Sequence, residues 1–418
     1  MNRWWIALAS VVMQMALGAF YAWSVFAKPL NAQFHWSIPQ ITVAFTLSVF
    51  GLGTGAFWGG LLMNRKGPRL AAILGGLLWG GGVFLASFAD HNLWWLWIAY
   101  GIIGGSGLGV GYVVPVAVLV KWFPERRGLM IGLAVGGFGA GALIVAPVAA
   151  RMILALGPML TLRYLGLAYL VVTVLAASLM HNPPVGWKPA GWVPSAAQAA
   201  QRSSRDYTLS EALGTWQFWM LCLFLSLNSM AGISVASQAA PLFMDLAKVS
   251  AIVAAGMAGT VAIGNGTGRL FWSWVSDFAT RKFTLFLMFL VQAVLFWIFP
   301  SLTSANSVLI VAFIILMCYG GGYGLMPTFA ADYFGPHHVG PIFGFMLLTW
   351  TFAAGFGPLV FAQMRQVTGS YGEVLHIVSA VMAVSMILPL LISPPHAKER
   401  TPSASGATVE EVGSDFSH

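Results

Sequence analysis

Long apolar stretches separated by short polar breaks run along almost the whole chain. Because a helix needs about 20 apolar residues to cross a bilayer, each stretch of that length predicts one membrane-spanning helix. About twelve such stretches can be marked, at 4–27, 39–63, 70–89, 93–119, 128–152, 160–180, 215–240, 250–275, 283–300, 306–331, 340–364 and 371–393. Lys28 and Pro29 are expected to end the first. The pattern predicts an all-α membrane protein with 12 transmembrane helices.

Two polar segments interrupt this pattern. Residues 182–213 are rich in proline, serine, glutamine and charged residues, and the chain ends in a polar tail. The predicted organisation is an N-terminal six-helix bundle at 1–181, a cytoplasmic linker at 182–213, a C-terminal six-helix bundle at 214–393 and a disordered cytoplasmic tail at 394–418. The composition excludes a soluble globular protein, since 58% of residues are hydrophobic and only 8% are charged.

The two halves of the chain repeat one another at an offset of about 212 residues. The matching positions are Gly111-Tyr112 with Gly322-Tyr323, Trp122-Phe123 with Tyr333-Phe334, Gly128 with Gly340, Pro29 with Pro241, and Pro147 with Pro358. Several matches in one register predict a duplicated unit, here two pseudo-symmetric six-helix bundles. Transporters built from such repeats bind substrate near the membrane midplane, between the halves.

The net charge of +8 follows from the expected topology. With the N-terminus inside, the outer segments hold Lys28, Arg151, Arg163, Lys248 and Arg365. Of the remaining cations, fourteen fall in inner segments and Arg269 lies within a helix. An inner excess of lysine and arginine predicts that both termini lie in the cytoplasm and that the protein resides in the cell (inner) membrane. The same distribution argues against nucleic acid as a partner.

Arg269 is the one charge placed well inside an apolar segment, which runs from Ile252 to Val275. A charge there costs about 3 kcal/mol on insertion scales, so such residues usually face a cavity and act on an ion or substrate. Arginine holds a carboxylate through a planar fork of donors and stays charged at any accessible pH. Asn265 lies one helical turn earlier on the same face and can add an uncharged hydrogen bond.

The acidic residues offer Arg269 no partner within the membrane. They are Asp90, Glu125, Asp206, Glu211, Asp245, Asp277, Asp332, Glu373, Glu399, Glu410, Glu411 and Asp415, all in loops, helix ends or the tail. A structural ion pair for Arg269 is therefore disfavoured, and an anionic substrate is favoured. Cys222 and Cys318 lie in apolar stretches, and the histidines form no cluster, so no metal site, cofactor or catalytic group is expected.

Two loops at matching places in the repeat resemble a known signature. Residues 60–69 read GLLMNRKGPR and residues 273–282 read SWVSDFATRK. They resemble the Gly-x-x-x-Asp-Arg-x-Gly-Arg-Arg loop of the major facilitator superfamily, although Asn64 replaces the acid in the first, and Phe278 and Thr280 replace Arg and Gly in the second. The gating residues that this resemblance implies are Gly60, Asn64, Arg65, Gly67, Arg69, Asp277 and Arg281. The fold it implies is the twelve-helix fold of that superfamily.

Three further segments narrow the resemblance. YAWSVF at 21–26, WFPERRG at 122–128 and TWQFW at 215–219 are similar to the oxalate/formate antiporter branch, which is related to the monocarboxylate transporters. In that branch an arginine of the eighth helix binds a substrate carboxylate inside an aromatic box. By position, the resemblance implies Arg269 for the carboxylate, and Tyr21, Tyr112, Tyr319 and Tyr323 for the box.

Trp350 marks a departure from the oxalate carriers of that branch. Those carriers place a lysine there as a second cation, whereas here the stretch 344–351 reads GFMLLTWT. A second carboxylate held by one arginine would stay buried and unpaired, at a cost of several kcal/mol. We therefore expect a substrate with one carboxylate, bordered by Trp350. Lys28 is the alternative second cation, but its place beside Pro29 favours a role at the outer surface.

The sequence predicts a secondary active transporter that moves a small monocarboxylate, such as lactate, pyruvate, formate or acetate, by alternating access. Proton symport and anion exchange both stay open, since no membrane-embedded acid is available to carry a proton. The alternatives are an oxalate/formate-type dicarboxylate exchanger and a non-transporting membrane sensor; a drug/proton antiporter and an enzyme are disfavoured. The expected partners are the monocarboxylate, a proton in the symport case, and the lipid bilayer, with the protein acting as a monomer.

Overall fold

The computed structural model describes residues 2–395, except 185, 195–201, 204 and 369–370. These residues form helices joined by short turns, and no strand occurs among them. Within them, nine helices are long and apolar enough to cross a membrane. The predicted all-α membrane fold is therefore confirmed. The predicted disordered tail lies outside the described residues from 396 onward.

The N-terminal half supplies the first six spanning segments. Its elements are α1 (Arg3–Gly18), the 3₁₀ turn η1 (Ala19–Trp23), α2 (Ser24–Phe34), α3 (Ile38–Lys66), α4 (Pro68–Ala86), α5 (Leu93–Leu96), the π-helical η2 (Trp97–Gly104), α6 (Gly105–Trp122) and α7 (Arg127–Ser178). The first segment consists of α1, η1 and α2, and the fourth of α5, η2 and α6. Helix α7 contains two spanning segments, because Gly157 has a φ of 79°, which favours glycine, and Pro158 begins the second segment.

The C-terminal half supplies the other six. Its elements are α9 (Leu209–Leu213), α10 (Trp216–Ser237), α11 (Ala239–Ala247), α12 (Ala251–Phe278), α13 (Arg281–Ile298), η3 (Phe299–Ser301), α14 (Ala305–Phe334), α15 (Val339–Thr368), α16 (Tyr371–Ser385) and α17 (Leu388–Leu391). Helix α10 is a spanning segment by itself, and α16 and α17 together form another. The helices match the predicted stretches in number and order.

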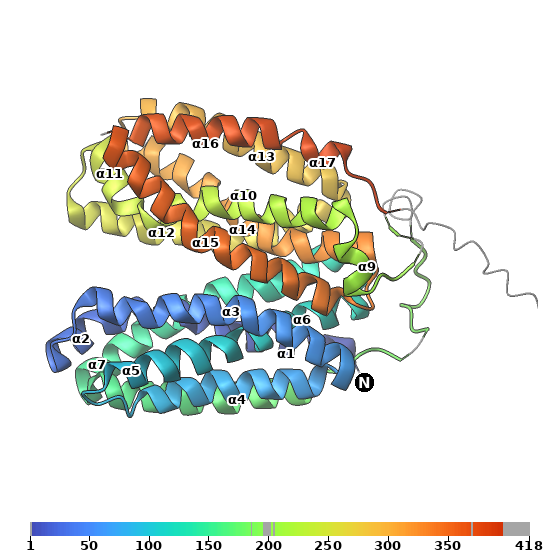
Figure 1. The fold of residues 1–418 in the computed structure, drawn as a ribbon, viewed down its shortest axis with the longest axis horizontal. Coiled ribbons are helices and arrows are strands. Elements are labelled where there is room, and N and C mark those ends of the chain that lie inside the picture. The colour runs from blue at the N-terminus through green and yellow to red at the C-terminus, as the bar shows by residue number, and fades with distance from the viewer. Residues whose placement is uncertain (1, 185, 195–201, 204, 369–370, 396–418) are drawn as a thin grey trace, which may run out of the picture.

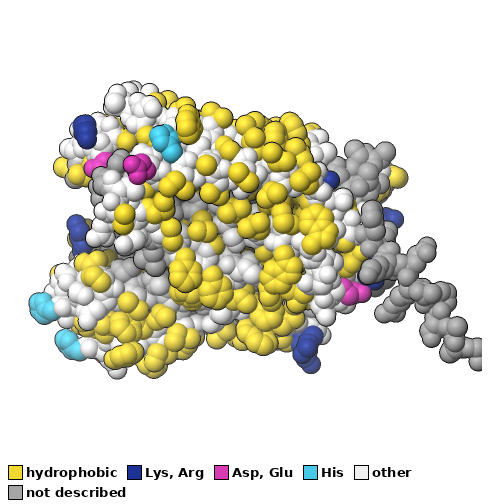
Figure 2. Space-filling model, turned by 45° about the horizontal axis from the view of Figure 1, so that its top comes forward, with side chains coloured by type: hydrophobic (Ala, Val, Ile, Leu, Met, Phe, Trp, Pro, Cys, Tyr) yellow, Lys and Arg dark blue, Asp and Glu magenta, His cyan; other side chains and the backbone are white. Residues whose placement is uncertain are grey.

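Figure 1 shows α1–α7 stacked against α10–α17 as two bundles. We call the end that carries the N-terminus, the α3–α4 turn at Gly67 and the α12–α13 turn at Ala279 the basic end. In Figure 2, hydrophobic side chains cover the middle of the visible face and charged ones lie towards its two ends, as expected for a protein that spans a bilayer. The exact domain boundaries at 181 and 214 stay a prediction.

One predicted boundary is wrong. The first spanning segment does not end at Lys28 and Pro29, because Pro29 lies inside α2 and the helix continues to Phe34. Helices that cross membranes tolerate an internal proline, since neighbouring helices and local 3₁₀ geometry compensate for the lost hydrogen bond. Here the 3₁₀ turn η1 directly precedes α2. Lys28 is therefore an exposed residue on a helix, not a residue at its end.

Candidate functional site

Arg269 lies on α12, where this helix packs against α7 of the other bundle. Its side chain is 1% exposed. The Nε atom donates to Oδ1 of Asn265 at 3.4 Å, and Nη1 donates to the carbonyl oxygen of Val135 on α7 at 3.5 Å. The helical spacing that predicted a shared face for Asn265 and Arg269 is thus visible as a contact. Among the described residues, no carboxylate forms an ion pair with Arg269.

Aromatic rings surround this guanidinium. Its Cζ atom lies 4.7 Å from the ring centre of Tyr323 and 5.6 Å from that of Phe138. Such contacts stabilise a cation in a site that water does not reach. The other three predicted tyrosines reach Arg269 through these two rings. Tyr319 is hydrogen-bonded to Tyr323, and Tyr21 and Tyr112 pack on Phe138.

The C-terminal half of the aromatic group is a connected cluster. The Tyr323 hydroxyl donates to the Tyr319 hydroxyl at 2.9 Å, and the ring of Tyr323 meets that of Trp350 edge-on at 5.7 Å. All three side chains are at most 6% exposed. The Nε1 atom of Trp350 is buried without a hydrogen-bond partner among the described residues. A donor in that state can bind an oxygen of a substrate.

Phe138 joins the N-terminal half of the group to Arg269, and the sequence reasoning missed it. Its ring contacts those of Tyr21 at 5.5 Å and Tyr112 at 5.0 Å, both edge-on. Tyr112 is buried, and its hydroxyl has no hydrogen-bond partner among the described residues. The available signal was a single aromatic residue within the glycine-rich run at 136–141.

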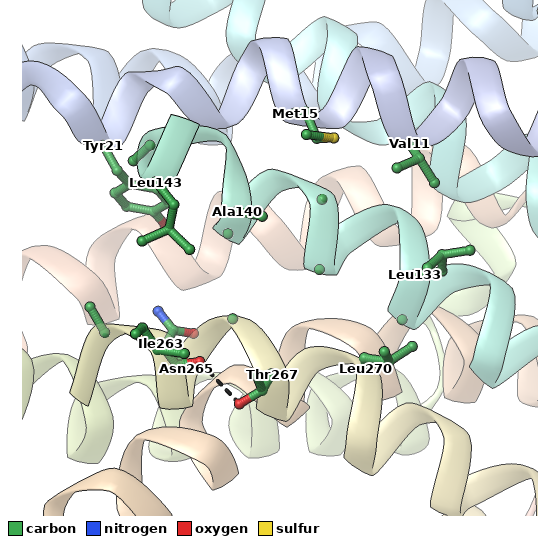
Figure 3. Close-up of a pocket in the computed structure, with 17 residues that line it drawn as sticks. Val11, Met15, Tyr21, Leu133, Ala140, Leu143, Ile263, Asn265, Thr267 and Leu270 are labelled. Carbon is green, nitrogen blue, oxygen red and sulfur yellow. Dashed lines mark hydrogen bonds between the residues drawn. The ribbon is translucent and has the colours of Figure 1, made fainter. Parts of the chain in front are cut away.

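A cavity of about 610 Å³ lies beside Arg269, between α1 and α7 on one side and α12 on the other. Figure 3 shows Tyr21 and Asn265 on opposite sides of this space. These two predicted residues line it, whereas Arg269, Tyr112, Tyr319, Tyr323 and Trp350 are buried next to it. Arg269 is therefore shielded from the cavity in this conformation. Phe138 on α7 packs against this guanidinium.

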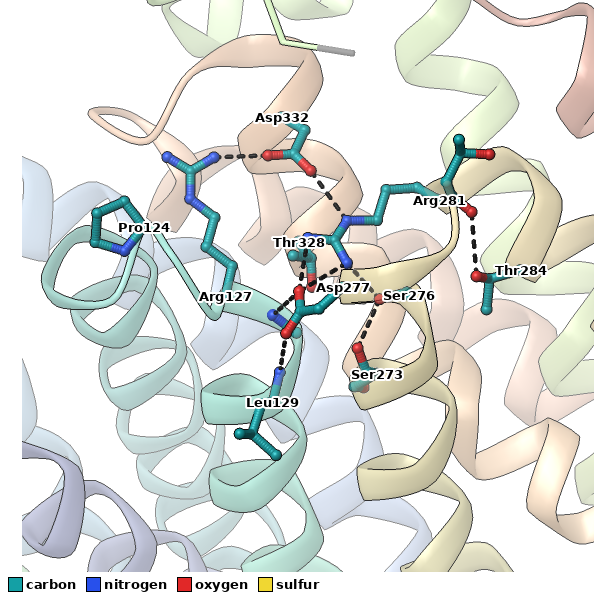
Figure 4. Close-up of polar contacts among 12 residues, drawn as sticks. Pro124, Arg127, Leu129, Ser273, Ser276, Asp277, Arg281, Thr284, Thr328 and Asp332 are labelled. Carbon is teal, nitrogen blue, oxygen red and sulfur yellow. Dashed lines mark hydrogen bonds and ion pairs between the residues drawn. The ribbon is translucent and has the colours of Figure 1, made fainter. Parts of the chain in front are cut away.

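The second signature loop connects the two bundles at the basic end. Asp277 on α12 accepts hydrogen bonds from the backbone N–H groups of Gly128 at 2.9 Å and Leu129 at 2.8 Å, at the start of α7. A carboxylate at a helix N-terminus is stabilised by the helix dipole. Arg281 donates to Asp277 at 3.0 Å, and Figure 4 shows these contacts as one network. These contacts join α7 of one bundle to α12 of the other at the basic end.

Arg127 and Asp332 complete this network, and the sequence reasoning did not select them. Nη1 of Arg127 donates to Oδ1 of Asp332 at 2.6 Å across the two bundles. Arg281 donates to Oδ2 of Asp332 at 3.0 Å, and Arg202 of the linker lies 3.5 Å from Oδ1. The internal repeat could have indicated Asp332. At an offset of 211 residues it matches Lys121 of the first half, so the two equivalent positions carry opposite charges.

The first signature loop makes fewer contacts. Gly67, with a φ of 88°, forms the turn between α3 and α4. Gly60 packs against α15, where a Cβ atom would lie 2.5 Å from the carbonyl oxygen of Gly340, so only glycine permits this approach. Asn64, Arg65 and Arg69 are exposed. The difference between the loops has a physical reason, since Asn64 lacks the charge with which Asp277 binds a helix N-terminus.

Comparison with known proteins identifies the family. A family model described as Major Facilitator Superfamily matches residues 6–358 and 259–413. The oxalate:formate antiporter of Oxalobacter formigenes is 27% identical over 364 residues, covering 85% of this chain and 83% of that protein. The apicoplast pyruvate carrier 1 of Toxoplasma gondii is 25% identical over 406 residues, covering 82% and 73%. The resemblance to the oxalate/formate branch is confirmed.

A solved structure supports the same fold. The transporter FucP in its outward conformation superposes with a TM-score of 0.73 at 15% identity, covering 92% of this chain and 97% of that one. At this identity the likeness concerns the fold alone. It confirms the predicted twelve-helix architecture with two six-helix bundles.

Proposed function

The chain belongs to the major facilitator superfamily, and from this premise we propose that it transports a small monocarboxylate by alternating access. The observation that carries the proposal is Arg269, a buried cation without an acidic partner among the described residues, enclosed by aromatic rings. Its guanidinium offers a bidentate site to one carboxylate. The substrate class is lactate, pyruvate, formate or acetate.

Trp350 supports one carboxylate over two. It packs on Tyr323, and Tyr323 packs on Arg269, so its indole borders the region where a second carboxylate would lie. An indole N–H can bind an oxygen but cannot neutralise a charge. The second candidate function is a dicarboxylate/formate exchanger, because one relative is named an oxalate:formate antiporter.

Transport follows from neutralisation of Arg269 by the substrate. The bound anion cancels the charge and allows α7 and α12 to close around it, so the loaded carrier changes state more readily than the empty one. Anion exchange and proton symport are both compatible with a carrier that changes state more readily when an anion neutralises Arg269. Because one chain supplies both halves of the site, we also propose a monomer, with the basic end and both termini in the cytoplasm.

A competition assay separates the two candidates. Proteoliposomes loaded with lactate are assayed for uptake of radiolabelled lactate, with pyruvate, acetate, formate or oxalate as competitor. We expect at least one monocarboxylate to halve uptake at a tenfold lower concentration than oxalate, because oxalate leaves one charge buried and unpaired. If oxalate competes best, the protein is a dicarboxylate/formate exchanger and the proposal of a monocarboxylate transporter is wrong.

Tyr112→Phe tests whether the aromatic group binds substrate or only packs. The hydroxyl has no partner to lose in the described structure, so melting temperature is expected to stay unchanged. Loss of one hydrogen bond to substrate, about 1 kcal/mol, should raise the half-saturating substrate concentration about fivefold. Tyr323→Phe is the comparison, because it also breaks the bond to Tyr319 and should lower the melting temperature. Unchanged transport by Tyr112→Phe would assign Tyr112 to packing.

A further inference from the structure

A second cavity, of about 600 Å³, lies at the basic end and shares no lining residue with the first. Its walls come from the end of α6, the start of α7, the linker, and the turn between α14 and α15. The charged or titratable residues that line it are Lys121, Arg127, Lys188, Arg202, Asp206 and His337. The size falls within the usual range of sites for small molecules, roughly 300–1,000 Å³.

The cavity is strongly cationic. Four of its described lining residues are lysine or arginine, and Asp206 is the one acid. Asp206 is already engaged, since its Oδ1 accepts the backbone N–H of His337 at 3.0 Å. Burial, and then the nearby Arg127, lower the pKa of Arg202 to about 10. Asp332, which is paired with Arg127 and lies 3.5 Å from Arg202, offsets part of this repulsion, and a bound anion would offset more of it.

Arg127 gives an independent sign of a missing ligand. Its side chain is 6% exposed, and its Nε atom is buried without a hydrogen-bond partner among the described residues. Nη1 of the same guanidinium donates to Asp332, but this hydrogen bond leaves Nε without a partner. A buried donor of a charged group rarely stays unpaired, because that costs a few kcal/mol. Arg127 lines the cavity, so a shift of its side chain is needed to bring Nε to an acceptor there.

Two described residues of the linker, Arg202 and Ser203, contact both bundles beside this cavity. Arg202 donates to the carbonyl oxygen of Pro124 at 3.0 Å, on the N-terminal bundle. Ser203 donates its N–H to the carbonyl oxygen of Asp332 at 2.8 Å, on the C-terminal bundle. A ligand within these walls contacts groups that separate when the basic end opens.

We propose that this cavity binds a small anion with two or more negative charges, best matched by a phosphoryl group, and that the bound anion holds the basic end closed. Arginine and lysine suit phosphate through charge-assisted hydrogen bonds, and a phosphate monoester carries nearly two charges at neutral pH. Because the ligand binds only the closed arrangement, it shifts the population towards it. The phosphoryl group comes from a soluble metabolite or from a lipid headgroup.

Binding is tested with pyrophosphate on the full-length protein in phosphatidylcholine nanodiscs at low salt, by calorimetry. We expect saturable binding, weakened at least tenfold in Lys121→Gln/Lys188→Gln and at least threefold in Lys188→Gln alone. Lys188 is exposed, so its replacement leaves the fold intact. Lys66→Gln is the matched control: it removes the same charge at the same end, outside the cavity, and should bind as the wild type does.

The lipid source is tested in nanodiscs that contain phosphatidic acid, whose headgroup is a phosphate monoester with nearly two negative charges at neutral pH. If a headgroup occupies the cavity, this lipid raises the melting temperature of the wild type but not of the double variant. The proposal is overturned if neither pyrophosphate nor phosphatidic acid acts on the wild type, or if Lys66→Gln weakens the effect as much as the double variant.

The effect on the gate is measured with spin labels at Lys66→Cys and Lys282→Cys, one on each bundle at the basic end. Pyrophosphate, or phosphatidic acid in the lipid case, should increase the population with the shorter distance between labels. Binding that leaves this distribution unchanged overturns the conformational part of the proposal.

Discussion

Replacing Arg269 by alanine is expected to lower monocarboxylate uptake at least a hundredfold, to the level of empty liposomes. The guanidinium is the one cation within the aromatic group, and its contacts are two weak hydrogen bonds and two aromatic rings. A carboxylate deprived of a buried bidentate partner loses charge-assisted hydrogen bonds worth about 1.5–3 kcal/mol each net, with the uncompensated burial of its own charge added. Initial uptake rates in proteoliposomes measure the loss.

Arg269→Lys distinguishes charge from geometry. Lysine keeps the charge but lacks the planar fork and the stacking on Tyr323, so uptake should still fall at least tenfold. The alanine variant should remain folded, because Arg269 forms no ion pair with an acid among the described residues. Its melting temperature should equal or exceed that of the wild type, since a charge within the membrane is costly. Uptake above a tenth of the wild-type rate in Arg269→Ala would contradict this role.

Asp332→Asn is expected to have the second largest effect, on the closed basic end. Asp332 is 4% exposed and is bound by Arg127 and Arg281, which come from different bundles. Removing the acid leaves both guanidinium groups buried without that charge, and breaking a buried pair in this way costs about 3–5 kcal/mol. The melting temperature should fall clearly, and the population with the basic end open should rise, as reported by the spin labels.

Glu211→Gln serves as the matched control for Asp332→Asn. It makes the same change from acid to amide, but Glu211 pairs with Arg205 at an exposed position. Exposed pairs contribute little, so its melting temperature should match that of the wild type. If both variants have the same melting temperature and the same population with the basic end open, Asp332 does not stabilise the closed basic end.

The central group could be predicted because helical spacing and charge cost act locally. Asn265 and Arg269 are one turn apart on a single helix, and an unpaired membrane charge is visible in the sequence. Asp277 and Arg281 were selected by the resemblance to the superfamily loop, and the four tyrosines by the resemblance to the oxalate/formate branch; the structure places Asp277 and Arg281 in one network. These residues share one helix or one turn, so their proximity follows from sequence distance alone.

Contacts between the bundles could not be predicted in this way. Phe138 meets Arg269, and Arg127 meets Asp332, only because α7 packs against α12 and α14. Sequence distance says nothing about which faces of these helices turn towards each other. The repeat gives the equivalent helices but not their side-chain partners, since Asp332 and Lys121 occupy matching positions with opposite charges.

Equilibrium binding to the purified protein tests most directly whether Arg269 holds one carboxylate. Radiolabelled lactate and pyruvate are titrated onto the wild type and Arg269→Ala in detergent, with acetate, formate and oxalate as competitors. Saturable binding to the wild type that monocarboxylates displace better than oxalate, together with its loss in Arg269→Ala, is the predicted result. Equal binding by Arg269→Ala would contradict the account.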